Sequence, residues 1–121
     1  MSARILVVED DVLNRMFYCE VLRREGYDIA EVGDGADMID RAHDYAPDLV
    51  IMDINLPNVS GLELIERIKA DARLQAIPVL AVTAYVGRQE EARIRVAGAG
   101  DFLAKPVTIR ELVGAIDRLL S

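Results

Sequence analysis

Residues 49–61 read LVIMDINLPNVSG and combine a short apolar run with a carboxylate at its end. Leu49–Met52 is entirely apolar, and Asp53 follows directly, before a turn rich in Pro, Asn, Ser and Gly. Apolar runs without polar alternation are typical of parallel strands that are buried on both faces. We therefore expect a central strand here, with Asp53 placed where that strand leaves the core.

Other short runs along the chain have a similar character. Ile5–Val8 and Val79–Val82 are apolar throughout, and Phe102–Ala104 is a shorter apolar run. Asp28–Val32 is a weaker candidate, because its acids suit the edge of a sheet better than the centre. Together with Leu49–Met52, these runs predict five strands.

Stretches with helical periodicity separate these strands. Asp11 is suited to cap the first helix and Gly26 to end it, and the segment from Thr108 to Glu111 has the pattern of a capping box. The predicted helices are Asp11–Glu25, Ala36–Tyr45, Gly61–Ala70, Gln89–Ala97 and Thr108–Leu120. Regular alternation of strands and helices predicts an α/β fold, with a doubly wound parallel sheet and helices on both faces.

Length and composition limit the classes of function. The 121 residues suit one domain, and the net charge of −7 argues against a nucleic-acid partner, because such partners select clustered Lys and Arg. The apolar run at the N-terminus is too short for a signal peptide or a membrane span, so we expect no membrane partner and a cytoplasmic location. Cys19 is the only cysteine, which excludes an internal disulfide.

Functional side chains stand at the carboxyl ends of the predicted strands, where open parallel sheets bind ligands. The first strand is followed by Glu9, Asp10 and Asp11, the third by Asp53, the fourth by Thr83, and the fifth by Lys105 and Pro106. Each signal alone has an ordinary explanation as a turn or surface residue. Their coincidence at four strand ends indicates one site.

Glu9, Asp10 and Asp53 fit a site for a hard cation. Clustered carboxylates repel one another unless a cation compensates their charge. A few protein oxygens completed by water are typical of Mg²⁺, and Mn²⁺ accepts similar ligands. The alternative for the acidic run is a solvated turn with a helix cap, and we expect Asp11 to be that cap.

Thr83 and Lys105 fit the binding of an anion. A hydroxyl can donate to a phosphoryl oxygen, and an ammonium can neutralise its charge. An anion site beside a carboxylate cluster is unusual unless the phosphoryl group is attached to one of the carboxylates. Because carboxylates are known covalent nucleophiles, Asp53 is the candidate acceptor.

Four motifs, in this order and spacing, resemble the receiver domain of two-component response regulators. They are VVEDD at 7–11, VIMDINLPNVSG at 50–61, VTA at 82–84 and AKP at 104–106. The resemblance covers essentially the whole chain and implies a flavodoxin-like (βα)5 sheet with the strand order 2-1-3-4-5. Because the fifth helix ends at the last residues, we expect a single receiver domain over residues 1–121 without an output domain.

The resemblance implies a role for the residues around the acceptor. Asp53 would take a phosphoryl group from a phosphohistidine, and Thr83 and Lys105 would contact the phosphoryl oxygens. Lys105–Pro106 would be a cis peptide. Small Ala84 would leave room for the phosphoryl group.

The resemblance also implies a ligand set for Mg²⁺. Asp10 and Asp53 would bind through their side chains, Asn55 through its backbone carbonyl, and Glu9 through water. Asn55 and Tyr85 occupy positions that tune the rate of phosphate hydrolysis in this family. Gly61 would permit the turn that leads into the third helix.

The same resemblance implies a switch, and the helical spacing of the first helix predicts exposed apolar residues that suit a partner face. Thr83 would move toward the phosphoryl group and Phe102 would follow, unless Phe102 is only a core residue. Leu13, Met16 and Pro106 would form a face for a histidine kinase or a histidine phosphotransfer protein, unless they are scattered surface hydrophobes.

The function implied is that of a stand-alone response regulator, a signalling protein that contacts a downstream protein or relays phosphate, and not an enzyme. One alternative is an aspartyl-phosphate phosphatase of the haloacid dehalogenase type, which requires a second Asp where this chain has Asn55. A second alternative is a receiver fold used only for protein interaction. The complete set of site residues argues against that alternative.

Overall fold

The computed structural model describes residues 2–85 and 87–121. The strands are β1 (Arg4–Val8), β2 (Asp28–Val32), β3 (Leu49–Asp53), β4 (Val79–Thr83) and β5 (Asp101–Ala104). The helices are α1 (Val12–Arg24), the short 3-10 helix η1 (Gly35–Asp37), α2 (Met38–Tyr45), α3 (Gly61–Ala70), α4 (Arg88–Ala97) and α5 (Ile109–Leu120). Among the helices of these residues, none has the length and apolar character that crossing a membrane requires.

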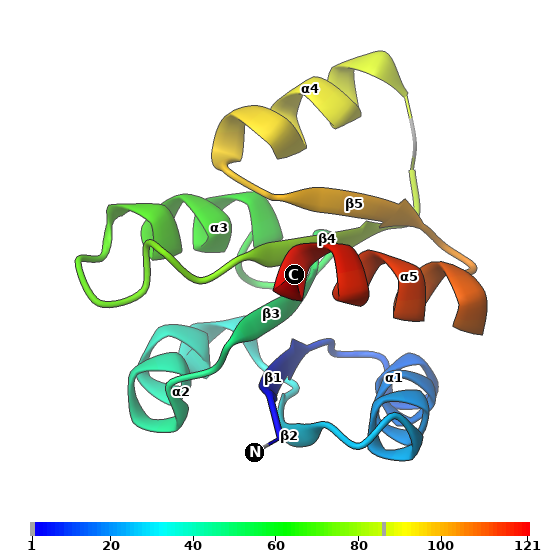
Figure 1. Cartoon of the computed structure of the whole chain (residues 1–121). Helices are drawn as coiled ribbons and strands as arrows, with labels where there is room; N and C mark the ends of the chain where they lie inside the picture. Colours follow the sequence, from blue (N-terminus) through cyan, green and yellow to red (C-terminus); the bar gives the residue numbers. More distant parts are fainter. Residues whose placement is uncertain (1, 86) are drawn as a thin grey trace.

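In the described part of the chain, the strands form one parallel sheet in the order β2-β1-β3-β4-β5. Figure 1 shows α1 and α5 on one side of this sheet and α2, α3 and α4 on the other. The acidic strand β2 lies at an edge, as its composition predicted. The predicted fold class and strand order are confirmed.

Each face of the sheet has its own aliphatic core. Side chains of β3 and β4 are buried along the whole strand, because they alternate between two faces that are both covered by helices. One core includes Leu22 of α1 and Ile116 of α5, and the other includes Ile65 of α3 and Ile94 of α4. Asp53 therefore ends a strand that is held from both sides.

Local signals place three helix ends where the sequence predicted them. The side chain of Asp11 accepts a hydrogen bond from the backbone N of Asn14 at 2.9 Å and caps α1. Gly26, with a φ of 87°, follows the end of this helix. Thr108 and Glu111 form the capping box of α5, in which each backbone N donates to the other side chain at 3.1 Å.

The second helix begins later than predicted. Ala36 lies in η1, and the α-helix starts only at Met38. The side chain of Asp34 accepts a hydrogen bond from the backbone N of Ala36 at 2.9 Å. This local bond closes a tight turn before the α-helical pattern can begin.

Candidate functional site

The register of the sheet brings the ends of four strands to one edge. β1 pairs with β3 in a register that places Glu9 beside Asp53. β4 pairs with β5 in a register that places Thr83 beside Ala104, directly before Lys105. Residues that are far apart in sequence thus meet at the carboxyl edge, as the alternating pattern predicted.

Glu9, Asp10 and Asp53 form an acidic cluster in which one oxygen of each lies within 4.8 Å of the others. Glu9 and Asp53 are buried, and Asp10 is exposed. Burial, together with the neighbouring carboxyl of Asp53, raises the pKa of Glu9 to about 7. The arrangement disfavours three ionised carboxylates unless positive charge is supplied.

Lys105 supplies positive charge at this edge. Its Nζ lies 3.1 Å from Oε1 of Glu9 and 3.5 Å from Oδ1 of Asp53, and 19% of its side chain is exposed. Burial acts to lower the pKa of Lys105, but the two carboxylates outweigh burial and raise it. The Lys105–Pro106 peptide is cis, as the resemblance implied. One ammonium facing three carboxyl groups leaves the edge with excess negative charge.

Asn55 connects the loop after β3 to the loop after β4. Its backbone N donates to Oδ1 of Asp53 at 2.9 Å, and its side-chain Oδ1 accepts a hydrogen bond from the backbone N of Ala84, also at 2.9 Å. These bonds fix the Asp53 carboxylate and the loop after β4 relative to each other. The use of the Asn55 carbonyl as a metal ligand stays a prediction.

Thr83 is buried at the end of β4, and its hydroxyl is bonded to Tyr85. The hydroxyl donates to the carbonyl of Tyr85 at 3.0 Å and accepts from its backbone N at 3.2 Å. Thr83 therefore has to release the Tyr85 carbonyl before it can donate to a phosphoryl oxygen.

Gly61 allows the start of α3 to lie directly against the end of β3. A Cβ at this position would meet the carbonyl oxygen of Asp53 and would lie 2.6 Å from Cα of Ile54. The backbone of Gly61 is outside the left-handed region, so the glycine is required for close approach and not for an unusual turn. This corrects the predicted reason for a glycine at this position.

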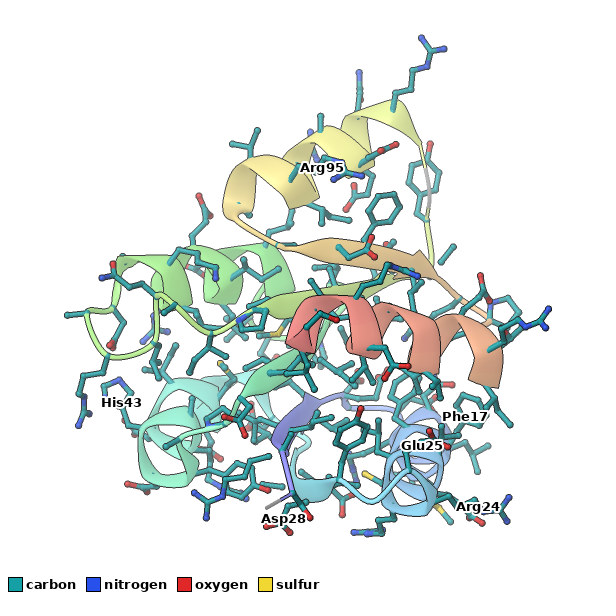
Figure 2. The ribbon with its side chains drawn as sticks, viewed as in Figure 1. Phe17, Arg24, Glu25, Asp28, His43 and Arg95 are labelled. Carbon is teal, nitrogen blue, oxygen red and sulfur yellow. The ribbon has the colours of Figure 1, made fainter. Side chains whose placement is uncertain are left out.

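Phe102 lies half-buried on β5 and packs against the core beneath α2, α3 and α4. The guanidinium carbon of Arg95 lies 5.4 Å from the centroid of its ring. Figure 2 shows Arg95 on α4, above β5. Phe102 of β5 thus contacts Arg95 of α4. Its part in a switch stays a prediction.

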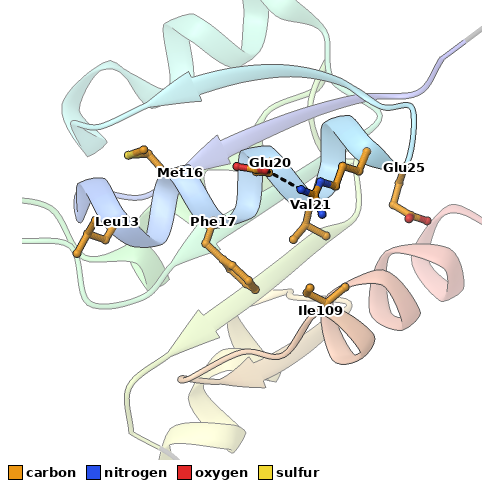
Figure 3. A pocket seen from close by; sticks show the side chains of 8 residues that line it. Leu13, Met16, Phe17, Glu20, Val21, Glu25 and Ile109 are labelled. Carbon is orange, nitrogen blue, oxygen red and sulfur yellow. Dashed lines mark hydrogen bonds and ion pairs between the residues drawn. The ribbon is translucent and has the colours of Figure 1, made fainter.

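A groove with a volume of about 500 Å³ lies between α1 and α5 (Figure 3). Leu13 and Met16 are 78% and 60% exposed and line one end of it. From α5 the lining includes Ile109, and the predicted Pro106 is not among the lining residues in the described part of the chain. The other lining residues are Phe17, Glu20, Val21, Arg24 and Glu25.

Cys19 and His43 have structural surroundings. Burial raises the pKa of the Cys19 thiol to about 11, which disfavours the reactive thiolate. Nε2 of His43 lies 2.6 Å from Oδ2 of Asp71, in the loop after α3 (Figure 2). No partner for His43 was predicted, because His43 and Asp71 lie 28 positions apart in the sequence.

Arg15 contacts the acidic edge of the sheet and was not predicted from the sequence. It lies in the first turn of α1, where a basic residue ordinarily faces solvent. In the structure its Nη1 donates to the backbone carbonyl of Glu9 at 2.8 Å. The only sequence signal is its spacing of four residues from the cap Asp11, which is too common to identify a role.

Comparison with known proteins decides the family. The family model of the response regulator receiver domain matches residues 5–117 of the chain. This protein belongs to the response regulator receiver domain family. Such domains are signalling modules of two-component systems, and the assignment confirms the response regulator prediction. Phosphorylation-dependent signalling and the acidic cluster are consistent with this family, and neither alternative is favoured.

Several relatives of the receiver domain are known. The polar-differentiation response regulator DivK of Brucella ovis is 36% identical over 120 residues, which covers 99% of this chain and 98% of DivK. The receiver domain of the sensor histidine kinase PA1611 from Pseudomonas aeruginosa is 30% identical with a TM-score of 0.90 over 99% of this chain and 98% of that domain. That structure has a magnesium ion coordinated in its active site cleft.

The chemotaxis protein CheY4 of Vibrio cholerae supports the fold assignment. Its structure has a TM-score of 0.94 at 24% identity and covers 99% of this chain and 100% of CheY4. At this identity the similarity concerns the fold alone. It agrees with the strand order observed in the sheet.

Proposed function

We propose that Asp53 accepts a phosphoryl group from a phosphohistidine of a histidine kinase or a histidine phosphotransfer protein. The phosphorylated protein then changes its contacts with a downstream protein or relays the phosphate. The observation that carries this proposal is the position of the Asp53 carboxylate. It is 2% exposed, lies within the acidic cluster and has the ammonium of Lys105 at 3.5 Å.

The transfer requires one bond to form and one to break. A carboxylate oxygen of Asp53 bonds to phosphorus, the phosphorus–nitrogen bond of the phosphohistidine breaks, and its electron pair stays on the imidazole nitrogen. Lys105 offsets the charge of the phosphoryl oxygens. Thr83 donates a hydrogen bond to one of these oxygens after it leaves the carbonyl of Tyr85.

The acidic cluster fits Mg²⁺, and Mn²⁺ can use the same oxygens. Within the described residues, Oε1 of the buried Glu9 has no hydrogen-bond partner, although Lys105 lies at ion-pair distance. Asp10 and Asp53 would hold the ion through their side chains, Asn55 through its carbonyl, and Glu9 through water. When bound, the ion supplies positive charge next to the developing phosphoryl charge.

Apart from the phosphohistidine of the donor and the metal ion, the groups that we propose to act in the transfer belong to this chain. The protein therefore takes part in its own phosphorylation and dephosphorylation, as a signalling protein and not as an enzyme with a separate substrate. A single receiver domain over residues 1–121 without an output domain, and a cytoplasmic location, stay predictions.

Movement of Thr83 provides a path for the signal. Release of the Tyr85 carbonyl changes the loop between β4 and α4. Because Arg95 of α4 covers the ring of Phe102, a shift of α4 changes the packing of β5. Phosphorylation would then act by shifting the population between two packings.

The groove between α1 and α5 is the proposed docking site for a helix of the phosphohistidine donor. Leu13 and Met16 offer exposed apolar surface at one end of the groove and Ile109 lies toward the other end, which suits a helix that lays its apolar face in a groove. Replacement of Leu13 and Met16 by Glu should reduce transfer from a phosphorylated donor protein at least tenfold and leave phosphorylation by acetyl phosphate unchanged. Val96→Glu is the control, because Val96 is 87% exposed on α4, outside the groove. An equal loss with both donors would contradict docking.

The phosphoacceptor is tested by intact mass after incubation with MgCl₂ and acetyl phosphate. The wild type should gain one phosphoryl group, and Asp53→Asn should gain none. Asp48→Asn is the matched control, because Asp48 precedes the same strand at the opposite edge, where it accepts a hydrogen bond from the backbone N of Arg4. An undiminished adduct in Asp53→Asn, or no adduct in the wild type, would overturn the proposal.

A further inference from the structure

We propose that Arg15 is a positioning residue for the metal site, and that it holds the backbone between Glu9 and Asp10 in the geometry that cation binding requires. Glu31 and Gly33 complete this arrangement. The inference rests on the proposed function of the acidic cluster. It adds three residues that do not touch the cation themselves.

Arg15 reaches from α1 to the end of β1. Its Nη1 donates to the carbonyl oxygen of Glu9 at 2.8 Å, and its Nε lies 3.4 Å from Oε1 of Glu31 on β2. Its side chain is 22% exposed, which is low for an arginine in the first turn of a surface helix. One guanidinium therefore joins three elements at the point where the chain leaves the sheet.

The bond to the Glu9 carbonyl has a direct consequence for Asp10. The carbonyl of Glu9 and the backbone N of Asp10 belong to the same planar peptide group. A hydrogen bond that fixes the Glu9 oxygen therefore also fixes the orientation of the backbone at Asp10. The other end of Glu9 is held as well, because its backbone N donates to the carbonyl of Val32 at 3.0 Å. Asp10 is exposed, and its orientation thus depends on this backbone.

Glu31 compensates the charge of Arg15. A guanidinium without a partner would oppose the binding of a second cation nearby. Because Glu31 pairs with Arg15 on the side away from the Glu9 carbonyl, the guanidinium can hold the backbone with less opposition to a metal ion.

Gly33 provides the space that this guanidinium occupies. A Cβ at position 33 would lie 2.8 Å from Nη1 of Arg15 and 3.5 Å from its Cζ. The nearest atoms all belong to the end of the Arg15 side chain, and Gly33 is outside the left-handed region of backbone conformation. Gly33→Ala should therefore displace the guanidinium without straining the chain.

Arg23 is a matched control within the same helix. Its Nη2 lies 3.6 Å from the other oxygen of Glu31, but its side chain is 61% exposed. Within residues 2–85 and 87–121, Arg23 forms an ion pair with Glu31 and makes no hydrogen bond to Glu9. Loss of Arg23 thus removes the same charge and a contact to the same carboxylate, and it leaves the Glu9 carbonyl in place.

The test is the dissociation constant for MgCl₂, measured by titration calorimetry on the full chain. Arg15→Met should weaken binding about tenfold, the usual effect of losing a residue that orients a metal ligand. Arg23→Met should change it less than twofold. Gly33→Ala should weaken binding in the wild-type background and have no further effect in Arg15→Met, because both changes remove the same contact.

The outcomes separate this inference from the proposed function. Urea unfolding in EDTA first establishes that each variant is folded. If the wild type binds Mg²⁺ and Arg15→Met binds it equally well, the positioning role is overturned and the metal site stands. The same conclusion follows if the losses of Mg²⁺ affinity in Gly33→Ala and Arg15→Met add fully in the double variant. A wild type that does not bind Mg²⁺ overturns the metal site and the positioning role together.

Discussion

Lys105 and Lys69 are both partly buried, and they lie at opposite ends of the sheet. Lys105 faces Glu9 at 3.1 Å and Asp53 at 3.5 Å, and these carboxylates raise its pKa against the effect of burial. Lys69 donates to the backbone carbonyls of Gln75 at 3.2 Å and Ile77 at 2.8 Å, and burial lowers its pKa. The same residue type thus has opposite shifts at the two ends.

The difference separates a functional edge from a structural one. Near the amino end of the sheet, Lys69 donates hydrogen bonds to backbone carbonyls at the end of a loop. Its side chain packs against Gly98, where an added Cβ would lie 2.6 Å from Cγ of Lys69. At the carboxyl end, Lys105 leaves excess negative charge uncompensated. Stability alone does not favour such an excess, and the proposed site for a cation and a phosphoryl group would explain it.

The largest expected effect is that of Lys105→Met. Removing the cation from buried carboxylates should lower the free energy of unfolding by about 3 kcal/mol in EDTA at pH 7.5, because the remaining charges have no partner. Mg²⁺ should restore part of this loss. Urea unfolding of the variant with and without MgCl₂ measures both values, and a loss below about 1 kcal/mol, the range of exposed pairs, would contradict the charge excess.

A second test concerns the protonation of Glu9. Its pKa is raised to about 7, so between pH 4.5 and 7 the folded protein holds a proton that the unfolded chain releases. In EDTA the wild type should therefore lose about 2.5 kcal/mol more than Glu9→Gln as the pH rises through this interval. Mg²⁺ should reduce that loss, since it favours the ionised carboxylate.

Unfolding curves at pH 4.5, 6 and 7.5 measure this difference. Comparison with Glu9→Gln removes the contributions of all groups that both proteins share. An equal pH dependence of the free energy of unfolding in the two proteins would show that ionisation of Glu9 does not destabilise the fold. That result would contradict the conclusion that the acidic cluster disfavours an ionised Glu9.

The smallest of these effects is expected for Lys69→Met. Its partners are neutral carbonyls near the surface, and loss of hydrogen bonds to such groups costs about 1 kcal/mol. The loss should be the same with and without MgCl₂, in contrast to Lys105→Met. A dependence on Mg²⁺ would mean that the two ends of the sheet are coupled.

The fold was predictable because its signals are local. The apolar runs of β3 and β4 identify buried parallel strands, and the caps Asp11 and Thr108 place two helix ends within one residue. The meeting of Asp53 and Lys105 at one edge follows from the alternation of strands and helices. The start of α2 was not predictable from the pattern, because the Asp34 side chain competes with the helix.

The contacts that support the site could not be predicted. Arg15 and Glu31 lie 16 positions apart on a helix and an edge strand, and the sequence pattern assigns both to the surface. Such roles depend on three-dimensional neighbours that one sequence does not reveal.

The central claim is that the excess charge at the carboxyl edge serves a phosphoryl group on Asp53. The most direct measurement is reduction of the acetyl-phosphate-treated protein with borohydride, which converts an aspartyl phosphate to homoserine, followed by peptide mapping. The account predicts homoserine at position 53 alone, in MgCl₂ and not in EDTA. Homoserine at another acidic residue, or at position 53 to the same extent in EDTA, would contradict it.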